Sequence, residues 1–411
     1  MEINLPGLLP SGRLLVAVTL VVSAPLFAGP ALAVGPVSVT CGQTLTADTT
    51  VGNDLVDCPG AGLIVGADDI TVDLDGHTID GLFDFFNTQV GIDNGAGHVG
   101  VRIRDGKVRQ FFVNIRSTGS GTVIEDVATE HSFNGGVRFE GVAGGKIERC
   151  SVTAPTEDSG IVLDGTDGVL VRSCAVSGAE DNAIRMVNSH HNRLENNLLV
   201  DSTSGIEMHG SDQNAIRHNT LKDNGVAIFL GDSDSNEVSG NTVSPEPGGS
   251  GTIFGDPLGV LINGGRDNRI TGNAITATCC IGGIDVTGSE GTVVDGNTVT
   301  IEGNGQTPNA AIVVRSASRD TMVSRNVANS HLTDGILVLD GAIGTLLLRN
   351  QANRNGLDGI RVLAISTTIA KNTADDNGNL GIEAVTGVID GGGNKASGNG
   401  NSAQCVGVLC T

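Results

Sequence analysis

Three consecutive segments of the chain carry one pattern: residues 183–199 read AIRMVNSHHNRLENNLL, residues 205–221 read GIEMHGSDQNAIRHNTL and residues 227–243 read AIFLGDSDSNEVSGNTV. Each segment begins with a small residue followed by Ile, and each ends with an Asn, an apolar position and a second Asn in fixed places. The second Asn recurs every 22 residues across the three segments. A fixed period of this size is typical of a repeat architecture.

The second Asn continues over most of the chain. Each repeat holds short alternating apolar runs separated by Gly, Asn, Asp and Ser, which favours strands over helices. We expect each repeat to be one coil of a parallel β-helix, with strands pairing to the next coil at about 4.8 Å. A buried Asn at one turn of every coil would then form a ladder, because stacked amides donate to one another. The expected ladder comprises Asn197, Asn219, Asn241, Asn273, Asn297, Asn326, Asn350, Asn372 and Asn394. We call this position of the repeat the ladder slot; upstream it is occupied by Cys174, Cys150 and, less regularly, Val127 and Gly106.

The repeat resembles the right-handed β-helix repeats of the pectate-lyase-like superfamily, and most of all the NosD-like repeat. The resemblance covers residues from about Leu63 to Asn394. It is specific for the fold, whereas the same scaffold carries lyases, hydrolases, epimerases, adhesins and binding proteins. Members with NosD-like repeats include a periplasmic protein associated with copper and relatives that modify carbohydrates.

The expected fold is all-β: a single-stranded right-handed parallel β-helix of about 13 coils, capped at both ends. Residues 1–33 are expected to be a secretory signal peptide, because Arg13 precedes an apolar run and Ala31-Leu32-Ala33 suits signal cleavage. Residues 34–62 would form an N-terminal cap, residues 63–394 the β-helix and residues 395–411 a C-terminal cap. The protein is therefore expected to be secreted, on the cell surface or periplasmic.

Eight cysteines in an exported chain indicate disulfide bonds. Cys150 and Cys174 occupy the ladder slot in successive coils, so their Cα atoms should lie about 5 Å apart, within disulfide range. We expect them to form a covalent rung that continues the Asn ladder. The two caps are expected to be closed by the pairs Cys41–Cys58 and Cys405–Cys410, while the adjacent Cys279 and Cys280 could be reduced, bonded to each other or bound to a metal.

The composition restricts the partners. The chain has 24 Lys and Arg against 46 Asp and Glu, a net charge of −22, which argues against nucleic acid as a partner. After signal cleavage no apolar run is long enough to cross a bilayer. The chain contains no Trp and no Tyr, the rings on which sugars usually stack. An acidic polysaccharide remains the candidate partner, provided that a local basic cluster overcomes the overall charge.

Aligning the coils on their small-residue–Ile start predicts a functional face. It places Asn114 with Arg116, Arg138 with Glu140, Val162 with Asp164, Arg185 with Val187 and Glu207 with His209 outward on one sheet. Enzymes of the resembled superfamily bind substrate on such a sheet, where Arg or Lys deprotonates or binds uronic acids and carboxylates hold Ca²⁺ or transfer protons. The resemblance therefore implies catalytic candidates Arg138, Arg185, Glu207 and His209, and substrate-binding candidates Arg116, Glu140 and Asp164. The alternative is a sheet surface stabilised by Arg–Glu pairs.

Three functions follow as hypotheses. The first is an exported carbohydrate-binding or surface scaffold protein, favoured because no catalytic signature motif is present. The second is a polysaccharide lyase or epimerase acting on uronic-acid polymers, for which Ca²⁺ would be the cofactor. The third, from the NosD resemblance, is a periplasmic copper-handling protein; His190, His191, His209 and His218 are its nearest candidates, but Met186 and Met208 are expected in the core. No resident metal or cofactor is expected otherwise.

Overall fold

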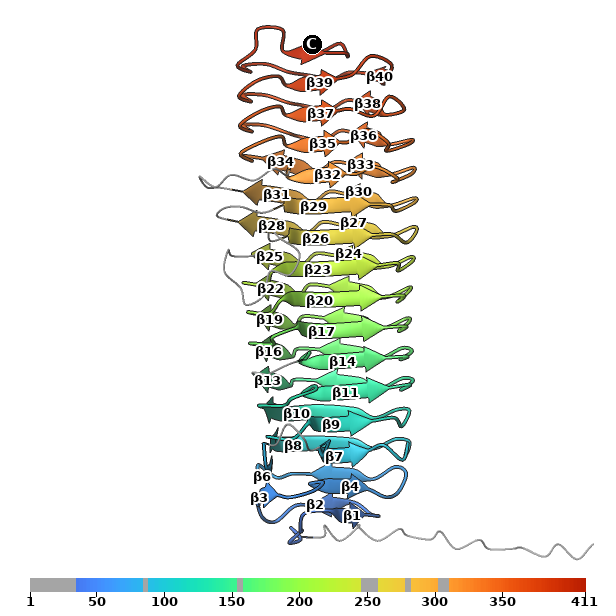
Figure 1. Cartoon of the computed structure of the whole chain (residues 1–411), viewed down its shortest axis with the longest axis vertical. Coiled ribbons are helices and arrows are strands. Elements are labelled where there is room, and N and C mark those ends of the chain that lie inside the picture. The colour runs from blue at the N-terminus through green and yellow to red at the C-terminus, as the bar shows by residue number, and fades with distance from the viewer. Residues whose placement is uncertain (1–34, 84–87, 154–157, 245–257, 278–281, 302–309) are drawn as a thin grey trace, which may run out of the picture. The chain divides into compact units, whose positions relative to one another are not determined.

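The computed structural model describes residues 35–83, 88–153, 158–244, 258–277, 282–301 and 310–411. The expected signal peptide and the adjacent Cys279 and Cys280 lie outside these residues. Residues 36–411 form one compact unit. Every strand pairing in this unit is parallel and joins successive coils, and the described residues contain no helix (Figure 1). The described part of the chain thus holds no helix that could span a membrane.

The first stack of strands is a 16-stranded parallel sheet. Fourteen of its strands, all but the first and the last, lie between residues 63 and 394, where about 13 coils were expected. Its strands are β1 (Gln43–Leu45), β4 (Leu63–Val65), β7 (Val90–Asn94), β9 (Val113–Ser117), β11 (Val137–Glu140), β14 (Ile161–Asp164), β17 (Asn182–Val187), β20 (Ser204–His209), β23 (Val226–Gly231), β26 (Leu258–Asn263), β29 (Gly282–Thr287), β32 (Ile312–Val314), β35 (Ile336–Val338), β37 (Ile360–Val362), β39 (Ile382–Ala384) and β41 (Cys405–Val406).

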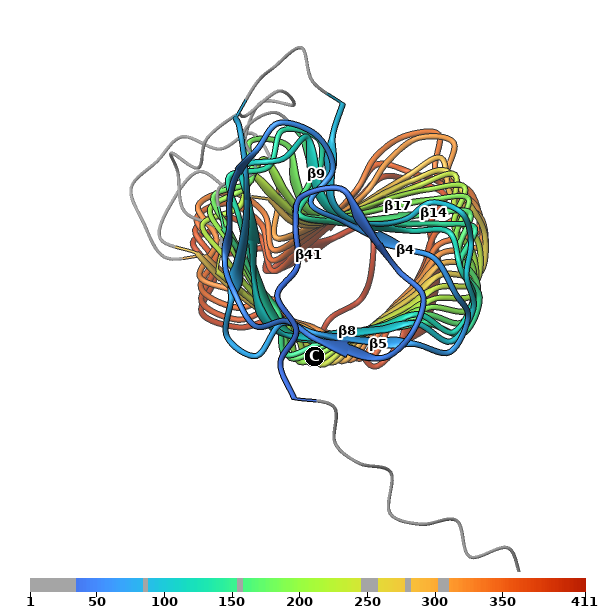
Figure 2. The same ribbon diagram turned by 90° about the horizontal axis from the view of Figure 1, so that it is seen from below.

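The second stack lies on another side of the same coils, as the view along the axis shows (Figure 2). Its strands are β2 (Thr49–Thr50), β5 (Thr71–Asp73), β8 (Arg102–Arg109), β10 (Val123–Glu130), β12 (Lys146–Glu148), β15 (Leu170–Arg172), β18 (Arg193–Glu195), β21 (Ala215–Arg217), β24 (Glu237–Ser239), β27 (Arg269–Thr271), β30 (Val293–Asp295), β33 (Met322–Ser324), β36 (Leu346–Leu348), β38 (Thr368–Ala370) and β40 (Ile389–Gly392).

The third stack follows the second after a short turn in each coil. The long strands β8 and β10 pair with neighbours in both stacks and so belong to each. The remaining strands of the third stack are β3 (Leu55–Cys58), β6 (Thr78–Gly81), β13 (Ser151–Thr153), β16 (Ala175–Ser177), β19 (Leu198–Val200), β22 (Thr220–Lys222), β25 (Thr242–Ser244), β28 (Ala274–Ala277), β31 (Thr298–Ile301) and β34 (Val327–Asn329).

The core consists of one apolar column after another, because the period of two along each strand sends alternate residues inward. Ile184, Ile206 and Ile228 are paired coil to coil and are fully buried, as are Met186 and Met208 beside them. The small residue before each Ile sits at a tight corner. At Gly205, for example, a Cβ would come within 2.6 Å of the carbonyl oxygen of Ala227 in the next coil.

The predicted Asn ladder is confirmed. All nine Asn side chains are at most 1% exposed. The Oδ1 atom of Asn219 accepts from both the backbone N–H and the Nδ2 of Asn197, each at 3.0 Å. The Nδ2 of Asn219 donates to Asn241 at 3.1 Å and to the carbonyl of Leu194 at 2.9 Å. Each amide therefore satisfies groups in the coils on both sides, which removes the cost of burying it.

The three predicted disulfides are confirmed, Cys41–Cys58, Cys150–Cys174 and Cys405–Cys410. The Cα atoms of Cys150 and Cys174 lie 4.5 Å apart. The backbone N–H of Cys174 donates to Asn197 Oδ1 at 3.0 Å. The disulfide therefore adjoins Asn197, the first Asn of the ladder, as expected.

Candidate functional site

The predicted face lies on the 16-stranded sheet, and the strand pairing sets its geometry. Arg138, Val162, Arg185 and Glu207 are in register on β11, β14, β17 and β20, and Phe229 of β23 follows. A parallel second row, two residues further along each strand, contains Glu140, Asp164, Val187 and His209. Neighbours within a row are separated by one strand spacing, about 4.8 Å. The predicted residues from four coils are thus brought together on one face.

The expected placement of the coil that contains Arg116 is wrong by two residues. Ile115 pairs with Val137 and Arg116 with Arg138, so Arg116 belongs to the row of Arg138 rather than that of Glu140. Asn114 instead occupies the small-residue position directly before the Ile of its coil and is fully buried. Its Nδ2 donates to the carbonyl of Glu130 at 3.0 Å. Asn114 is therefore part of the core wall and not of the outward face.

Two of the three arginines on this face are neutralised by carboxylates. Arg116 donates to Asp93 through Nε and Nη2, both at 3.0 Å. Arg138 donates from Nε to Glu140 at 2.6 Å and lies 3.8 Å from Asp158. The local basic cluster that an acidic polysaccharide would need is therefore not formed by these two arginines. In this half of the face the arginines form ion pairs across the sheet surface, as the alternative to a substrate-binding face had predicted.

The other half of the face is different. Within the described residues Arg185 has no ion pair or hydrogen bond of its side chain, and it lies one strand from Glu207. The Glu207 carboxylate accepts from His209 Nε2 at 2.7 Å and from Ser204 Oγ at 3.4 Å. The His209 ring lies 5.3 Å from the ring of Phe229, tilted by 55°. We call Arg185, Glu207, His209 and Phe229 the Arg185 cluster.

Two carboxylates that the sequence argument missed stand at the edge of this cluster. Asp158 and Asp181 each precede the Ile that starts their strand by three residues, so the fixed offset could have identified them. Burial raises the pKa of Asp181, and the nearby charges of Glu207 and Asp158 raise it further, while Arg185 opposes the shift. A carboxyl group that holds its proton more firmly beside a histidine-bonded carboxylate provides a proton donor and an acceptor on one surface.

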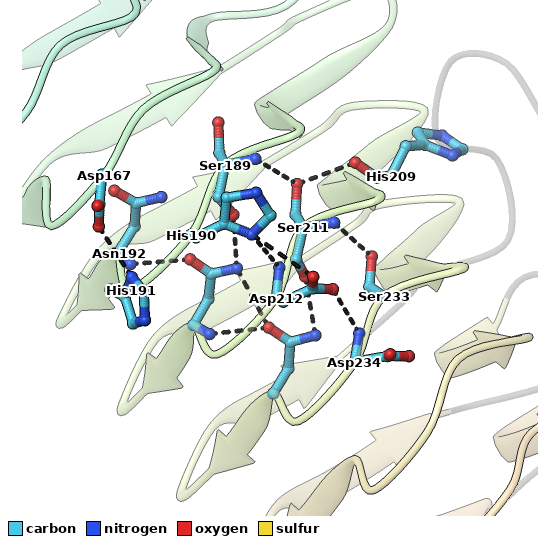
Figure 3. A network of polar contacts seen from close by, with 12 residues as sticks. Asp167, Ser189, His190, His191, Asn192, His209, Ser211, Asp212, Ser233 and Asp234 are labelled. Carbon is cyan, nitrogen blue, oxygen red and sulfur yellow. Dashed lines mark hydrogen bonds and ion pairs between the residues drawn. The ribbon is translucent and has the colours of Figure 1, made fainter.

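Two of the other histidine candidates, His190 and His191, lie in the turn between the first and second stacks (Figure 3), whereas His218 lies between β21 and β22. His191 Nδ1 is 2.9 Å from Asp167, and hydrogen bonds to Asp167 and then Gln213 raise the pKa of His191. His190 Nδ1 accepts the backbone N–H of Asp212 at 3.1 Å. His209 is oriented away from this turn, and its backbone carbonyl accepts from Ser211 (Figure 3). The described residues contain no group of three His, Cys, Asp or Glu side chains able to hold a metal ion.

The same turn contains a second Asn ladder that the sequence argument did not identify. Its members are the first Asn of each quoted repeat, which the pattern recorded without assigning a role. Asn214 donates from Nδ2 to Asn236 Oδ1 at 3.1 Å, and Asn236 donates to Asn268 at 3.2 Å. A row of serines parallels it, since the N–H of Ser189 donates to Ser211 Oγ at 3.1 Å. These rows stabilise the turn and leave its histidines at the surface.

Two family models match the chain. The model described as periplasmic copper-binding protein (NosD) matches residues 109–275, which include the candidate face, and the model described as right handed beta helix region matches residues 252–400. None of the curated proteins compared with the sequence matches it.

Several solved structures are similar. DFA-IIIase from Arthrobacter chlorophenolicus A6 in complex with GF2 has 14% identity and a TM-score of 0.47, with 57% of this chain and 68% of that chain covered. The mannuronan C-5 epimerase AlgE4 A-module of Azotobacter vinelandii has 13% identity and a TM-score of 0.41, covering 80% and 89%. Tailspike protein 3 of bacteriophage CBA120 has 12% identity and a TM-score of 0.43, covering 90% and 56%. By its coil-to-coil strand pairing and by the two family models, the chain is a right-handed parallel β-helix repeat protein.

Proposed function

We propose that the protein is an exported carbohydrate-binding protein, whose ligand is an acidic polysaccharide lying along the 16-stranded sheet over the Arg185 cluster. Three disulfides and the match to a family described as periplasmic favour an exported protein. The observation that carries the binding proposal is a combination in adjacent coils: an arginine that has no ion pair within the described residues, a hydrogen-bonded Glu207–His209 pair and a phenylalanine ring.

Each part of the cluster suits one feature of a uronic-acid chain. The Arg185 guanidinium can bind a carboxylate through two N–H groups, which is the strongest neutral-pH contact available to it. Glu207 and His209 can exchange hydrogen bonds with sugar hydroxyls. The apolar face of a sugar ring can pack on Phe229. Because the carboxylates of Asp181 and Glu207 lie near Arg185, the site is suited to one uronate among neutral neighbours rather than to a densely charged chain.

The matched test uses two arginines from the same row. Arg185→Ala should weaken binding of soluble uronate polymers by about tenfold or more, because a charge-assisted hydrogen bond contributes about 1.5–3 kcal/mol. Arg116→Ala, at a distance of three strand spacings, removes an arginine already paired with Asp93 and should leave the affinity unchanged. Titration calorimetry gives both values. Equal loss of affinity in the two variants, or no binding by the unaltered protein, would contradict the proposal.

A lyase or epimerase activity is the second candidate, favoured by the raised pKa of Asp181 next to Glu207. If it operates, uronate polymers should yield unsaturated products that absorb in the ultraviolet, or change their uronate composition, with and without added Ca²⁺. Asp181→Asn should then abolish turnover but preserve binding. The NosD match makes copper the remaining candidate. A copper titration of the unaltered protein, and of the His190→Ala and His191→Ala variants, tests it directly.

A further inference from the structure

The third stack presents an outward surface unlike the other two. Strands β13, β16, β19, β22, β25, β28, β31 and β34 lie one above another along one side of the coils (Figure 1). They pair in register without a bulge. In each of them the second residue points into the core, and the first and third residues face outward. We call these first and third residues the neutral strip.

Charge is almost absent from this strip. Lys222 is its one ionisable residue, although the chain has a net charge of −22. The second stack provides a comparison within the same coils. Nine of the 16 first and third residues of β12, β15, β18, β21, β24, β27, β30 and β33 are Asp, Glu, Lys or Arg. The two stacks have the same strand geometry, so the fold does not require the outward residues of the strip to be uncharged.

The strip consists mostly of residues with hydroxyl groups or small apolar groups. Thr242, Ala274 and Thr298 are consecutive in register and exposed. Thr276 is exposed beside them, and Leu198 is 43% exposed further along the same row. Within the described residues the hydroxyls of Thr242, Thr276 and Thr298 have no hydrogen-bond partner. Nine of the 16 residues of the strip are Ser or Thr and five are Ala, Val or Leu, in rows with the strand spacing of about 4.8 Å.

The dimensions of the strip argue against a second copy of this chain as its occupant. Eight strands at about 4.8 Å and three residues at about 3.3 Å each give a surface of roughly 380 Å². A stable protein–protein interface needs about 800 Å² from each partner. A flat surface of this size also cannot enclose a small molecule. It suits a partner that is itself extended, flat and periodic, against which many weak contacts add together.

We propose that the neutral strip is a docking face for an uncharged, ordered polysaccharide surface such as that of an insoluble glucan or chitin. Sugar hydroxyls would exchange hydrogen bonds with the threonine hydroxyls, and the C–H faces of the sugars would pack on the Ala and Leu side chains. Because the strip has no carboxylates, this side of an acidic protein can contact the neutral polysaccharide without burying unpaired charges. This inference is independent of the Arg185 cluster, which lies on another sheet and takes a soluble acidic glycan.

The experiment measures how the purified protein partitions onto microcrystalline cellulose, crystalline chitin and insoluble β-1,3-glucan. The double variant Thr242→Glu with Thr298→Glu introduces two carboxylates into the strip. The matched control, Ala215→Glu with Thr271→Glu, introduces the same charges on the second stack in coils of the same region. Partition of the strip variant should fall about tenfold or more because unpaired carboxylates must be desolvated against the neutral surface. The control should partition like the unaltered protein, and all three should melt at the same temperature.

Several results would overturn the proposal. One is failure of the unaltered protein to bind any of the three solids; another is equal binding by the strip variant. Inhibition of ice growth without glycan binding would assign the periodic face to ice instead. If the unaltered protein is a dimer and the strip variant is a monomer, the strip is the interface with a second copy of the chain. Arg185→Ala should leave binding to the solids intact, so failure here and failure of the acidic-glycan proposal are distinguishable.

Discussion

The N-terminal and C-terminal coils have the same fold but differ in what holds one coil to the next. From β8 to β15 the second stack carries a continuous ion-pair network on its outer surface. Arg149 binds Asp126 at 2.6 Å and Glu125 at 3.2 Å, and Arg172 binds Glu148 at 2.7 Å. In these coils the ladder slot contains Gly106, Val127 and then the Cys150–Cys174 disulfide.

From Asn197 onward the same slot is occupied by the amide ladder, which runs without a break to Asn394. In the last coils a further ladder appears, in which Asn355 donates to Asn377 and Asn377 to Asn399, both at 3.0 Å. Each coil of the β-helix therefore needs one interaction that holds it to the next coil. The chemistry of that interaction can change along the chain, from ion pairs and a disulfide to buried amides. Exposed ion pairs are weak and screened by salt, whereas buried amides have no water to replace a lost partner.

The largest effect should follow from breaking the ladder. Asn219→Leu leaves the buried backbone N–H of Asn197 without an acceptor. It also removes one of the two acceptors of Asn197 Nδ2, which still donates to the carbonyl of Val171, and a donor to the carbonyl of Leu194. Since the unsatisfied N–H costs about 1–3 kcal/mol and each of the other lost hydrogen bonds about 0.5–1.5 kcal/mol, the free energy of unfolding should fall by about 3–5 kcal/mol. Thr220→Leu is the control, because it adds the same side chain one position further on the outer surface. Similar denaturant midpoints for the two variants would refute the role of the ladder.

Removal of the covalent rung should have the next largest effect. The double change Cys150→Ala with Cys174→Ala releases a cross-link between residues 24 apart, which should cost about 2–4 kcal/mol. The loss should be concentrated in the N-terminal coils, where the ladder is absent. Hydrogen exchange resolved by peptide would detect it as faster exchange in β10, β12 and β13. Uniform acceleration along the whole chain would instead mean that the coils unfold as one unit.

The ion-pair network should matter least and depend on salt. Arg149→Ala removes contacts to Asp126, Glu125 and Glu148 on an exposed surface. A small drop in melting temperature is expected at low ionic strength, and it should vanish near 1 M NaCl, where the Debye length is about 3 Å. Asn219→Leu should be insensitive to the same salt change. A salt-independent effect of Arg149→Ala would show that its contribution is packing rather than charge.

Acid should act in opposite directions on the two regions. The hydrogen bond from Arg149 lowers the pKa of Asp126, so its stabilising contribution is present above the unfolded value of 3.8 and is lost as pH falls through the folded pKa. Burial raises the pKa of Asp334, so its contribution is present below 3.8 and is lost as pH rises through the folded pKa. Hydrogen exchange compared at about pH 7 and about pH 3.5 should therefore show weakening near β10 and strengthening near β35. Parallel changes in both regions would contradict this assignment.

Much of the fold and part of the candidate site could be predicted from local spacing. The 22-residue period of Asn197, Asn219 and Asn241 defines one position of the repeat, and Cys150 and Cys174 occupy the same position. Arg185, Glu207 and His209 could be assigned to one face because each stands at a constant offset from its Ile. The offset failed at Asn114, where the coil starts two residues later than the pattern suggested. It also passed over Asp158 and Asp181, which lie in the turn before the strand and carry no apolar signal.

The sequence by itself determined the coil, the buried ladder, the disulfide pairs and the two sides of each strand. Parallel stacking in register copies any periodic feature straight from the chain into space, so such features need no knowledge of distant contacts. Which outward charges neutralise each other depends on the tertiary structure, in which Arg116 and Arg138 are paired and Arg185 has no ion pair within the described residues. The tertiary structure also decided that the outward residues of eight strands form one nearly uncharged strip. These properties depend on side chains from different coils reaching one another, and the repeat period contains no information about that.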